Sequence, residues 1–340
     1  MKDLFEKLLI LRTPGIGPAR YNDLIARFGS VEQAAASLMM DASHIDMVRR
    51  EMDNAANLGI EYICDDDARY PVGLKAIKNH PPVISVRGNV DALTRPVVSM
   101  VGTRHATAAG MEFMANMSMA FASRGFVVAS GMAMGCDTAA HRGALRASAD
   151  AVTIAVLAGG VDYIWPLENE SLYYQILERG CVISEMPVGF KPTAPNFVQR
   201  NRIVAGMCDT LILGEADMKS GSMTTARFAV EYGRPVYAIP SHPSDPRGAG
   251  PNSLIRAGVA TLCMGVGDFF EKGNDTPQKQ KNEKKFDSEN SLIDALGTIP
   301  VSESVLAEVV KKSVSEIKSE LVVLELQGIV RKVDGGYVRA

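Results

Sequence analysis

Cysteine and tryptophan are scarce in this 340-residue chain, which has 5 cysteines and 1 tryptophan. The cysteines are Cys64, Cys136, Cys181, Cys208 and Cys263. No two of them stand in the C-x-x-C spacing of a zinc or redox site. Their odd number and scattered positions are typical of reduced thiols and argue against a disulfide framework. We therefore expect a cytoplasmic protein that has no zinc site.

The chain also lacks a long hydrophobic run and a net positive charge. No apolar run reaches the roughly 18 residues that a membrane helix requires, and the charged first residues do not begin a signal peptide. The net charge is -3, so any nucleic-acid site must be a local basic patch. The length of 340 residues predicts two or three domains.

Helical patterns fill the first part of the chain, and we expect a helical domain over residues 1–62. Within it, Thr13–Arg20 reads T-P-G-I-G-P-A-R. This stretch resembles the turn of a helix–hairpin–helix (SAM-like) domain, where glycines let backbone N–H groups approach a DNA phosphate. A small helical bundle whose glycine turn contacts no DNA explains the same residues, and one short turn does not decide between the two.

We expect a Rossmann-like DNA-binding domain over residues 63–271, within which strands and helices alternate from Arg95 to about Phe270. The predicted strands are Val97–Val101, Phe126–Ala129, Val152–Leu157, Val182–Ser184, Thr210–Leu213 and Val236–Ile239. The predicted helices are Thr107–Arg124, Asp137–Ala147, a helix capped by Asn169, and Thr224–Tyr232. This alternation predicts an α/β fold, an extended Rossmann-like, doubly wound and mainly parallel sheet.

The C-terminal part has a different pattern. Residues 272–287 are polar and lysine-rich, as in a linker, and residues 288–340 suggest short helices followed by a hairpin with an Asp334-Gly335 turn. Helices followed by a two-stranded wing predict a winged-helix domain. Its recognition helix would carry three acids, Glu316, Glu320 and Glu325, so protein contact or plain packing is as good an interpretation as DNA reading.

A dinucleotide site is the first possibility that such a fold raises. It needs G-x-G-x-x-G after the first strand and an acid at the end of the second strand. The first turn reads G-T-R-H-A-T, and the second strand ends in Ala129-Ser130-Gly131. Both parts of the motif are missing, so we expect no nicotinamide cofactor and predict no cofactor at all.

Small residues and arginines gather instead at the predicted strand ends. They include Gly102, Thr103 and Arg104, then Ser130 and Gly131, then Ser220 and Gly221, and the segment Gln199, Arg200, Asn201 and Arg202. Small residues expose backbone N–H groups, and guanidinium groups bind phosphate oxygens. We expect three guanidinium groups, of Arg104, Arg200 and Arg202, on one rim at the sheet edge. A structural arginine pair that bridges loops is the alternative for Arg200 and Arg202.

Three other features need separate interpretations. Asp137 and His141 stand four apart on a predicted helix, but no third metal ligand is indicated, so a helix cap and a hydrogen-bonded histidine are the preferred interpretation. Phe197 could stack on a base of a single strand. For Trp165, which stands in a turn that enters a predicted helix, packing is the default expectation.

Five motifs stand in a fixed order over about residues 96–262. They are V-G-T-R (Val101–Arg104), S-G-M-A-M-G-C-D-T-A-A-H (Ser130–His141), L-A-G-G-V-D (Leu157–Asp162), Q-R-N-R-I-V-A-G (Gln199–Gly206) and S-G-S-M-T-T-A (Ser220–Ala226). Together they resemble the DNA-processing protein A family (DprA, also called Smf). The resemblance implies a homodimer that binds single-stranded DNA and loads the RecA recombinase onto it during natural transformation, without catalysing a reaction.

The resemblance also implies roles for single residues. Arg104 matches the basic residue of the first motif, and Arg200, Asn201 and Arg202 match the family's R-N-R segment. Gly102, Thr103, Ser130 and Gly131 match the small residues of the DNA pocket. Met134 and Gln199 stand where some relatives have arginine and lysine, so we expect a less basic pocket here.

Two other classes of function remain open from the sequence. Related Rossmann-like enzymes hydrolyse nucleotides with a P-G-G-x-G-T-x-x-E loop, which Ser220–Thr225 and Glu231 match poorly. An interaction scaffold with a vestigial pocket is the third hypothesis.

Overall fold

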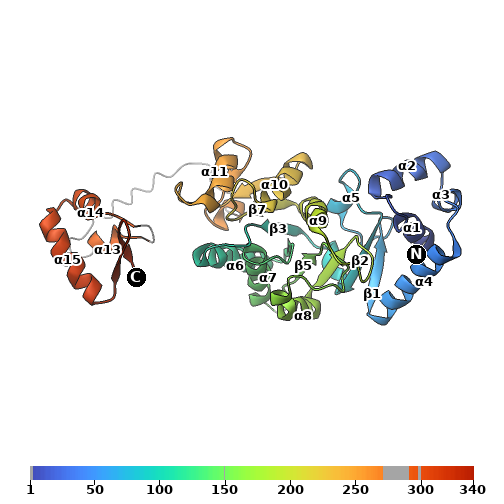
Figure 1. The fold of residues 1–340 in the computed structure, drawn as a ribbon, viewed down its shortest axis with the longest axis horizontal. Coiled ribbons are helices and arrows are strands. Elements are labelled where there is room, and N and C mark those ends of the chain that lie inside the picture. Colours follow the sequence, from blue (N-terminus) through green and yellow to red (C-terminus); the bar gives the residue numbers. More distant parts are fainter. Residues whose placement is uncertain (1–2, 149, 271–290, 298–299) are drawn as a thin grey trace. The chain divides into compact units, whose positions relative to one another are not determined.

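The computed structural model describes residues 3–148, 150–270, 291–297 and 300–340. The chain divides into two compact units, Met1–Gly273 and Asn274–Ala340, which we describe separately (Figure 1). The predicted linker, residues 272–287, lies outside the described residues. No described helix combines the length and the apolar character needed to cross a membrane.

Nine strands of the described residues form one sheet in the first unit, in the order β1-β2-β6-β5-β4-β3-β7-β8-β9. Their bounds are β1 (Ile60–Cys64), β2 (Val83–Gly88), β3 (Val97–Val101), β4 (Val127–Ser130), β5 (Thr153–Val156), β6 (Cys181–Ser184), β7 (Thr210–Leu213), β8 (Val236–Ala238) and β9 (Thr261–Leu262). In the sheet order from β6 through β3 to β9, every neighbouring pair is parallel. β2 pairs antiparallel with both of its neighbours, β1 and β6. The predicted doubly wound, mainly parallel sheet is confirmed.

The strand order reverses between β3 and β7. From β3 the chain builds outward through β4, β5 and β6, and it then crosses back to place β7 on the other side of β3. In an open α/β sheet, such a reversal leaves a crevice outside the carboxyl ends of the two strands. The backbone joins the two ends there, because Gly214 N–H donates to Val101 at 2.8 Å and Thr103 N–H donates to Glu215 at 2.6 Å.

Helices cover both faces of the sheet (Figure 1). The helices that follow β1 in this unit, with η for a 3-10 helix, are α5 (Val72–Lys75), η1 (Val90–Thr94), α6 (Ala108–Ala122), α7 (Cys136–Arg146), η2 (Leu167–Asn169), α8 (Glu170–Arg179), α9 (Ala194–Met207), α10 (Gly221–Glu231), η3 (Pro246–Gly248), α11 (Ala249–Arg256) and α12 (Gly267–Phe270). The side chains of β3 alternate between faces, as a strand requires. Val97 and Val101 pack with α9 and α10, and Val98 and Met100 pack with α6 and α7.

The N-terminal helices belong to the same compact unit as the sheet. They are α1 (Leu4–Leu11), α2 (Pro18–Phe28), α3 (Val31–Ser37) and α4 (Ala42–Asn57). Leu8 and Val48 pack in one cluster with Tyr62 of β1. Arg12 forms a buried ion pair with Glu51 at 2.7 Å. The expected boundary after residue 62 falls inside β1, because this strand pairs with β2 as part of the sheet.

The second unit has the predicted winged-helix elements. They are α13 (Ser291–Asp294), α14 (Glu303–Val310), α15 (Val314–Leu326), β10 (Val330–Val333) and β11 (Gly336–Arg339). Leu306 of α14, Leu321 of α15 and Val330 of β10 share its core. The wing turns at Gly335, whose φ of 91° suits glycine.

Candidate nucleic-acid interface

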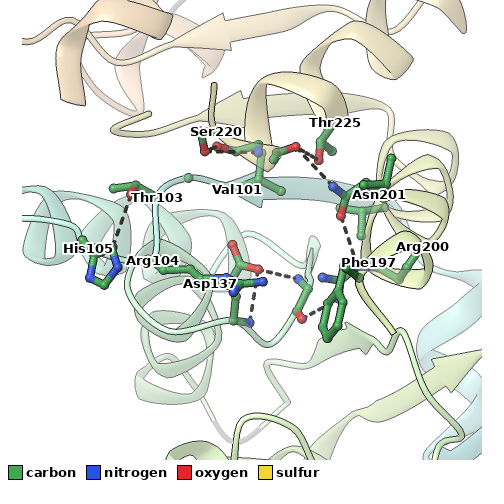
Figure 2. Close-up of a pocket in the computed structure, with 18 of the residues that line it drawn as sticks. Val101, Thr103, Arg104, His105, Asp137, Phe197, Arg200, Asn201, Ser220 and Thr225 are labelled. Atoms are coloured by element: carbon green, nitrogen blue, oxygen red, sulfur yellow. Dashed lines mark hydrogen bonds between the residues drawn. The ribbon is translucent and has the colours of Figure 1, made fainter. Parts of the chain in front are cut away.

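A cavity of about 540 Å³ lies at the reversal of strand order, outside the carboxyl ends of β3 and β7 (Figure 2). Eight of the eleven predicted site residues line it, namely Gly102, Thr103, Arg104, Gly131, Arg200, Asn201, Ser220 and Gly221. These residues come from four segments that are far apart in the sequence. The expectation that the fold gathers these strand ends at one edge is confirmed.

Two glycines are required by the packing beneath the cavity. A Cβ on Gly131 would lie 2.6 Å from the guanidinium of Arg200. A Cβ on Gly102 would lie 2.4 Å from the Sγ of Cys136. Real Cβ atoms do not tolerate such distances, so both positions need glycine for close packing as well as for access by a ligand.

Arg104 is the exposed guanidinium of the cavity. Its Cζ lies 4.9 Å from the ring centre of Trp165 and 5.6 Å from that of Phe197. Within the described part of the chain, no carboxylate forms an ion pair with it and no acceptor receives a hydrogen bond from it. Its charge is therefore available to an anionic ligand.

Arg200 has a different environment, since its side chain is turned inward. It donates to the backbone oxygens of Gly131 and Val156. The Gly131 N–H in turn donates to the carboxylate of Asp137 at 3.1 Å, so the backbone of one residue contacts both buried charges. Burial lowers the pKa of Arg200 to about 10, with Asp137 opposing that shift. Burial raises the pKa of Asp137, and Arg200 opposes that change.

Three predicted residues do not line the cavity. Arg202 forms a largely buried ion pair with Glu185 and donates to the backbone oxygen of Asn79 at 3.2 Å. Ser130 is buried and donates to the backbone oxygen of Met100 at 2.6 Å. Gln199 lines a separate cavity of about 380 Å³ beside the turn that precedes α2.

The expectation of three guanidinium groups on one open rim is therefore wrong, and α9 supplies the reason. Arg200 and Arg202 lie on this helix, where residues two apart point about 200° away from each other. The start of the helix has recognisable signals: Pro195 stands in the first turn, and the side chain of Asn196 accepts from Thr193 N–H at 2.8 Å. For Arg202, the alternative of a structural arginine fits the geometry.

The N-terminus of α10 forms the opposite wall. The Ser220 side chain caps the helix by accepting from Ser222 N–H at 3.3 Å. Asn201 donates to the backbone oxygen of Gly221 at 3.2 Å and accepts from Arg200 at 3.2 Å. The positive end of a helix dipole thus faces the cavity, which favours an anion there.

Sequence reasoning missed Trp165 as part of this site and Asn169 as a support for the loop beside it. Trp165 lines the cavity and contacts Phe197, with 4.4 Å between ring centres. Asn169 stands before α8 but does not cap it. Its amide donates instead to the backbone oxygen of Met132 at 2.9 Å and to Thr138 at 2.8 Å, which ties two loops together. The available signal was the position of Trp165 in the turn between a strand and the next helix.

Asp137 and His141 have partners other than a metal. Asp137 accepts from the backbone of Gly131 and, at 3.3 Å, of Ala133. The Nδ1 of His141 donates to Thr153 at 2.7 Å, because the Thr153 hydroxyl itself donates to Val128. The preferred interpretation of a hydrogen-bonded histidine is confirmed, whereas Asp137 binds the preceding loop instead of capping its own helix.

The buried His141 predicts a pH dependence of stability. Burial, with a further contribution from Arg200, lowers its pKa from 6.5 to about 3. As the pH falls, the unfolded chain therefore takes up this proton before the folded chain does. The free energy of unfolding has its full value above pH 6.5 and decreases as the pH drops toward 3. By pH 5 the loss should be ~2 kcal/mol. Urea unfolding of wild type and His141→Gln at pH 7 and 5 checks this, and parallel losses in the two proteins would contradict it.

The geometry does not suit nucleotide hydrolysis. Glu231, the acid considered for that role, is the last residue of α10, whereas the cavity is at the first turn. Ten residues of helix separate them by ~15 Å. Among the described residues that line the cavity, the carboxylate is that of Asp137, which is buried and already bonded.

Comparison with known proteins agrees with the motifs. Residues 61–274 match the family described as DNA recombination-mediator protein A. Residues 1–51 match the DprA-like N-terminal HHH domain, and residues 276–336 match the DprA winged helix domain. Protein Smf of Escherichia coli (strain K12) is 33% identical over 288 residues, which are 81% of this chain and 76% of that protein. Protein Smf of Synechocystis is 35% identical over 245 residues, 71% of this chain and 55% of that protein's length.

Solved structures agree as well. DNA processing protein A from Streptococcus pneumoniae aligns with a TM-score of 0.67 and 29% identity, covering 80% of this chain and 99% of that one. DNA processing protein A from Helicobacter pylori, whose single-stranded DNA binding mode has been described, aligns with a TM-score of 0.57 and 28% identity, covering 63% and 95%. By its motifs, its fold and these relatives, the chain belongs to the DNA recombination-mediator protein A (DprA/Smf) family.

Proposed function

We propose that this protein binds single-stranded DNA across the carboxyl edge of its sheet and loads RecA onto that DNA during natural transformation. The observation that carries the proposal is Arg104, an exposed guanidinium with no acidic partner in the described chain, at a cavity walled by glycines and a helix N-terminus. Such a cavity suits a polyanion.

In this proposal, the residues around the cavity have different roles. Arg104 and the backbone N–H groups at the start of α10 hold phosphates. Arg200, which is buried against the Gly131 and Val156 carbonyls, shapes the cavity without touching the strand. The protein acts by binding, since the carboxylate that lines the cavity is occupied by backbone N–H groups.

Titration of labelled oligothymidine and of a duplex of equal length into the full chain tests DNA binding. Tighter binding of the single strand, which weakens as salt rises, is expected. Equal binding of the duplex, or none of either, would contradict the proposal. The RecA step is tested separately by the lag before RecA hydrolyses ATP on single-stranded DNA, which the full chain should shorten.

We also propose a homodimer that forms at the outer edge of the sheet. β9 is the last strand in the order, and it pairs with β8 on one side. Around it, apolar side chains are exposed: Val259 is 44% exposed, Leu262 41% and Met264 72%. An open strand edge with apolar side chains readily pairs with a second copy of itself.

Changing both Leu262 and Met264 to lysine is expected to raise the dimer Kd by about 30-fold, the effect of one strong interface residue. Buried lysines at the centre of the interface would lose their hydration without gaining a partner. Sedimentation velocity over a concentration series measures this. Met39→Lys is the matched control, because Met39 is an apolar side chain that is 91% exposed elsewhere in the unit. A double variant that dimerises like the control would contradict this interface.

A further inference from the structure

Helix α15 forms one side of the second unit (Figure 1) and is apolar on both of its faces. Ile317 and Leu321 face inward and belong to the core of this unit. On the outward face, Val322 is 53% exposed, Val323 is 52% exposed and Leu326 is 84% exposed. Exposed apolar side chains that are grouped in this way mark an interaction surface.

The charges of α15 do not suit DNA as the partner of this surface. The helix carries three acids, Glu316, Glu320 and Glu325, and one basic residue, Lys318. An excess of acidic side chains repels phosphates, whereas a helix that reads DNA needs basic ones. The outward face of α15 therefore fits a protein partner.

Four residues form a straight stripe along the outward face, namely Ser315, Ser319, Val322 and Leu326. Their spacings of four, three and four residues place them on one side of the helix, as in the seam of a coiled coil. The Ser319 hydroxyl donates to the backbone oxygen of Ser315 at 3.1 Å. A partner can therefore cover this hydroxyl without leaving its donor unpaired.

The stripe is complementary to itself when a second copy runs in the opposite direction. Ser319 of each copy then lies opposite Val322 of the other, and Ser315 of each lies opposite Leu326 of the other. Every large side chain meets a small one, and the two-fold axis repeats each contact. Parallel copies would instead place leucine against leucine and serine against serine, which leaves one end overfilled and the other underpacked.

Two charges beside the stripe favour the same arrangement. Lys318 and Glu325 are seven residues apart, so they lie on the same flank of the helix. In the antiparallel pair, Lys318 of each copy lies beside Glu325 of the other. Lys318 is 59% exposed and reaches Glu303 at 3.4 Å, whereas the Glu325 carboxylate has no ion-pair partner among the described residues. Antiparallel pairing gives this carboxylate a partner.

We propose that the outward face of α15 binds the same face of a second copy of this chain, as an antiparallel and two-fold symmetric helix pair. This interface is separate from the β9 edge, because it lies in the other compact unit. The winged-helix unit is then a self-association module, which agrees with the acidic character of its would-be recognition helix.

Charge reversal tests the helix pair in the full chain. The parent protein carries Leu262→Lys and Met264→Lys, so that the β9 edge contributes nothing to association. Sedimentation velocity over a concentration series should still show a dimer of this parent. Lys318→Glu should raise the dimer Kd about tenfold, because it sets acids of the two copies side by side at two places.

Adding Glu325→Lys to Lys318→Glu should restore the parent Kd, because both ion pairs re-form with their charges exchanged. The contact of Lys318 with Glu303 inside one copy is not restored in this double variant, so recovery reports contact between copies. A double variant as weak as Lys318→Glu alone, or a parent that stays monomeric at every concentration, would overturn the proposal.

Disulfide cross-linking tests the direction of the pair. All five native cysteines are buried, so a cysteine introduced on α15 is the reactive one. A mixture of Ser319→Cys and Val322→Cys chains should form a cross-linked dimer on oxidation, because these positions are opposed. Ser319→Cys alone should not, because antiparallel pairing separates its two copies by more than the ~7 Å between Cα atoms that a disulfide spans. The reverse result would overturn the antiparallel pair.

Leu326→Glu, added to both cysteine variants, should abolish the cross-link, because it places a charge in the seam. Val72→Glu is the matched control, since Val72 is an apolar side chain of the first unit that is 83% exposed. The control should leave the cross-link unchanged. Equal yields from the Leu326→Glu and Val72→Glu chains would also contradict the interface.

Discussion

Replacing Arg104 by glutamate is expected to weaken binding of single-stranded DNA by about 30-fold, equivalent to ~2 kcal/mol. The wild-type guanidinium has no acidic partner in the described chain, so its full charge is available to the strand. Glutamate removes that donor and adds a charge that repels phosphate. Because a phosphate contact carries no sequence information, oligonucleotides of any sequence should be weakened about equally.

The control for this experiment is Arg227→Glu, which changes charge by the same amount on an exposed face of α10. It should bind DNA nearly as wild type does. Anisotropy titrations over a salt series add a second measure, since each lost phosphate contact on a single strand makes the log–log slope shallower by about 0.7. Wild-type affinity of Arg104→Glu at moderate salt would refute the site.

The sequence was sufficient to predict the central parallel strands of the sheet, β3 to β8, and the place of the cavity. Val97–Val101 and Thr210–Leu213 are strands with the predicted bounds. Their apolar runs of β-branched residues are typical of strands buried on both faces, so a local pattern carries the information. The alternation of elements then predicts a doubly wound sheet, and this topology places ligands at the strand ends.

The orientation of the arginines could not be predicted in the same way. Arg200 and Arg202 are neighbours in the sequence, but α9 turns one toward Gly131 and the other toward Glu185. The choice depends on partners that lie 69 and 17 residues away in the sequence. The short segment Gln199–Arg202 contains no such information, although Pro195 and Asn196 are signals that a helix begins there.

Trp165 shows the same limit of sequence-based prediction, but for a site residue that was not predicted. Its neighbours in the sequence gave no reason to prefer a ligand over packing. Its contacts with Arg104 and Phe197 join three segments, which follow β3, β5 and β6 in the chain and which only the fold brings together. The aromatic contacts of Trp165 are therefore found only from the fold, whereas residues in glycine-rich turns are found by motif.

We expect the largest loss of stability when the buried Arg200 is replaced. Arg200→Met should lower the free energy of unfolding by about 3 kcal/mol, because it leaves two buried carbonyls without donors and removes the charge that offsets Asp137. Adding Asp137→Asn should recover at least ~1 kcal/mol, since the isolated buried charge is then gone. Urea unfolding of the single and double variants measures both values. A double variant no more stable than Arg200→Met would contradict the coupling.

DNA binding separates a shaping role of Arg200 from a phosphate contact. At a temperature well below its unfolding midpoint, the Arg200→Met variant should bind single-stranded DNA more weakly than wild type, because the Gly131 loop loses the Arg200 hydrogen bond that supports it. Its salt dependence should stay that of wild type, since no phosphate contact is lost. A slope shallower by about 0.7, as expected for Arg104→Glu, would instead show that Arg200 leaves its carbonyl partners and binds the strand itself.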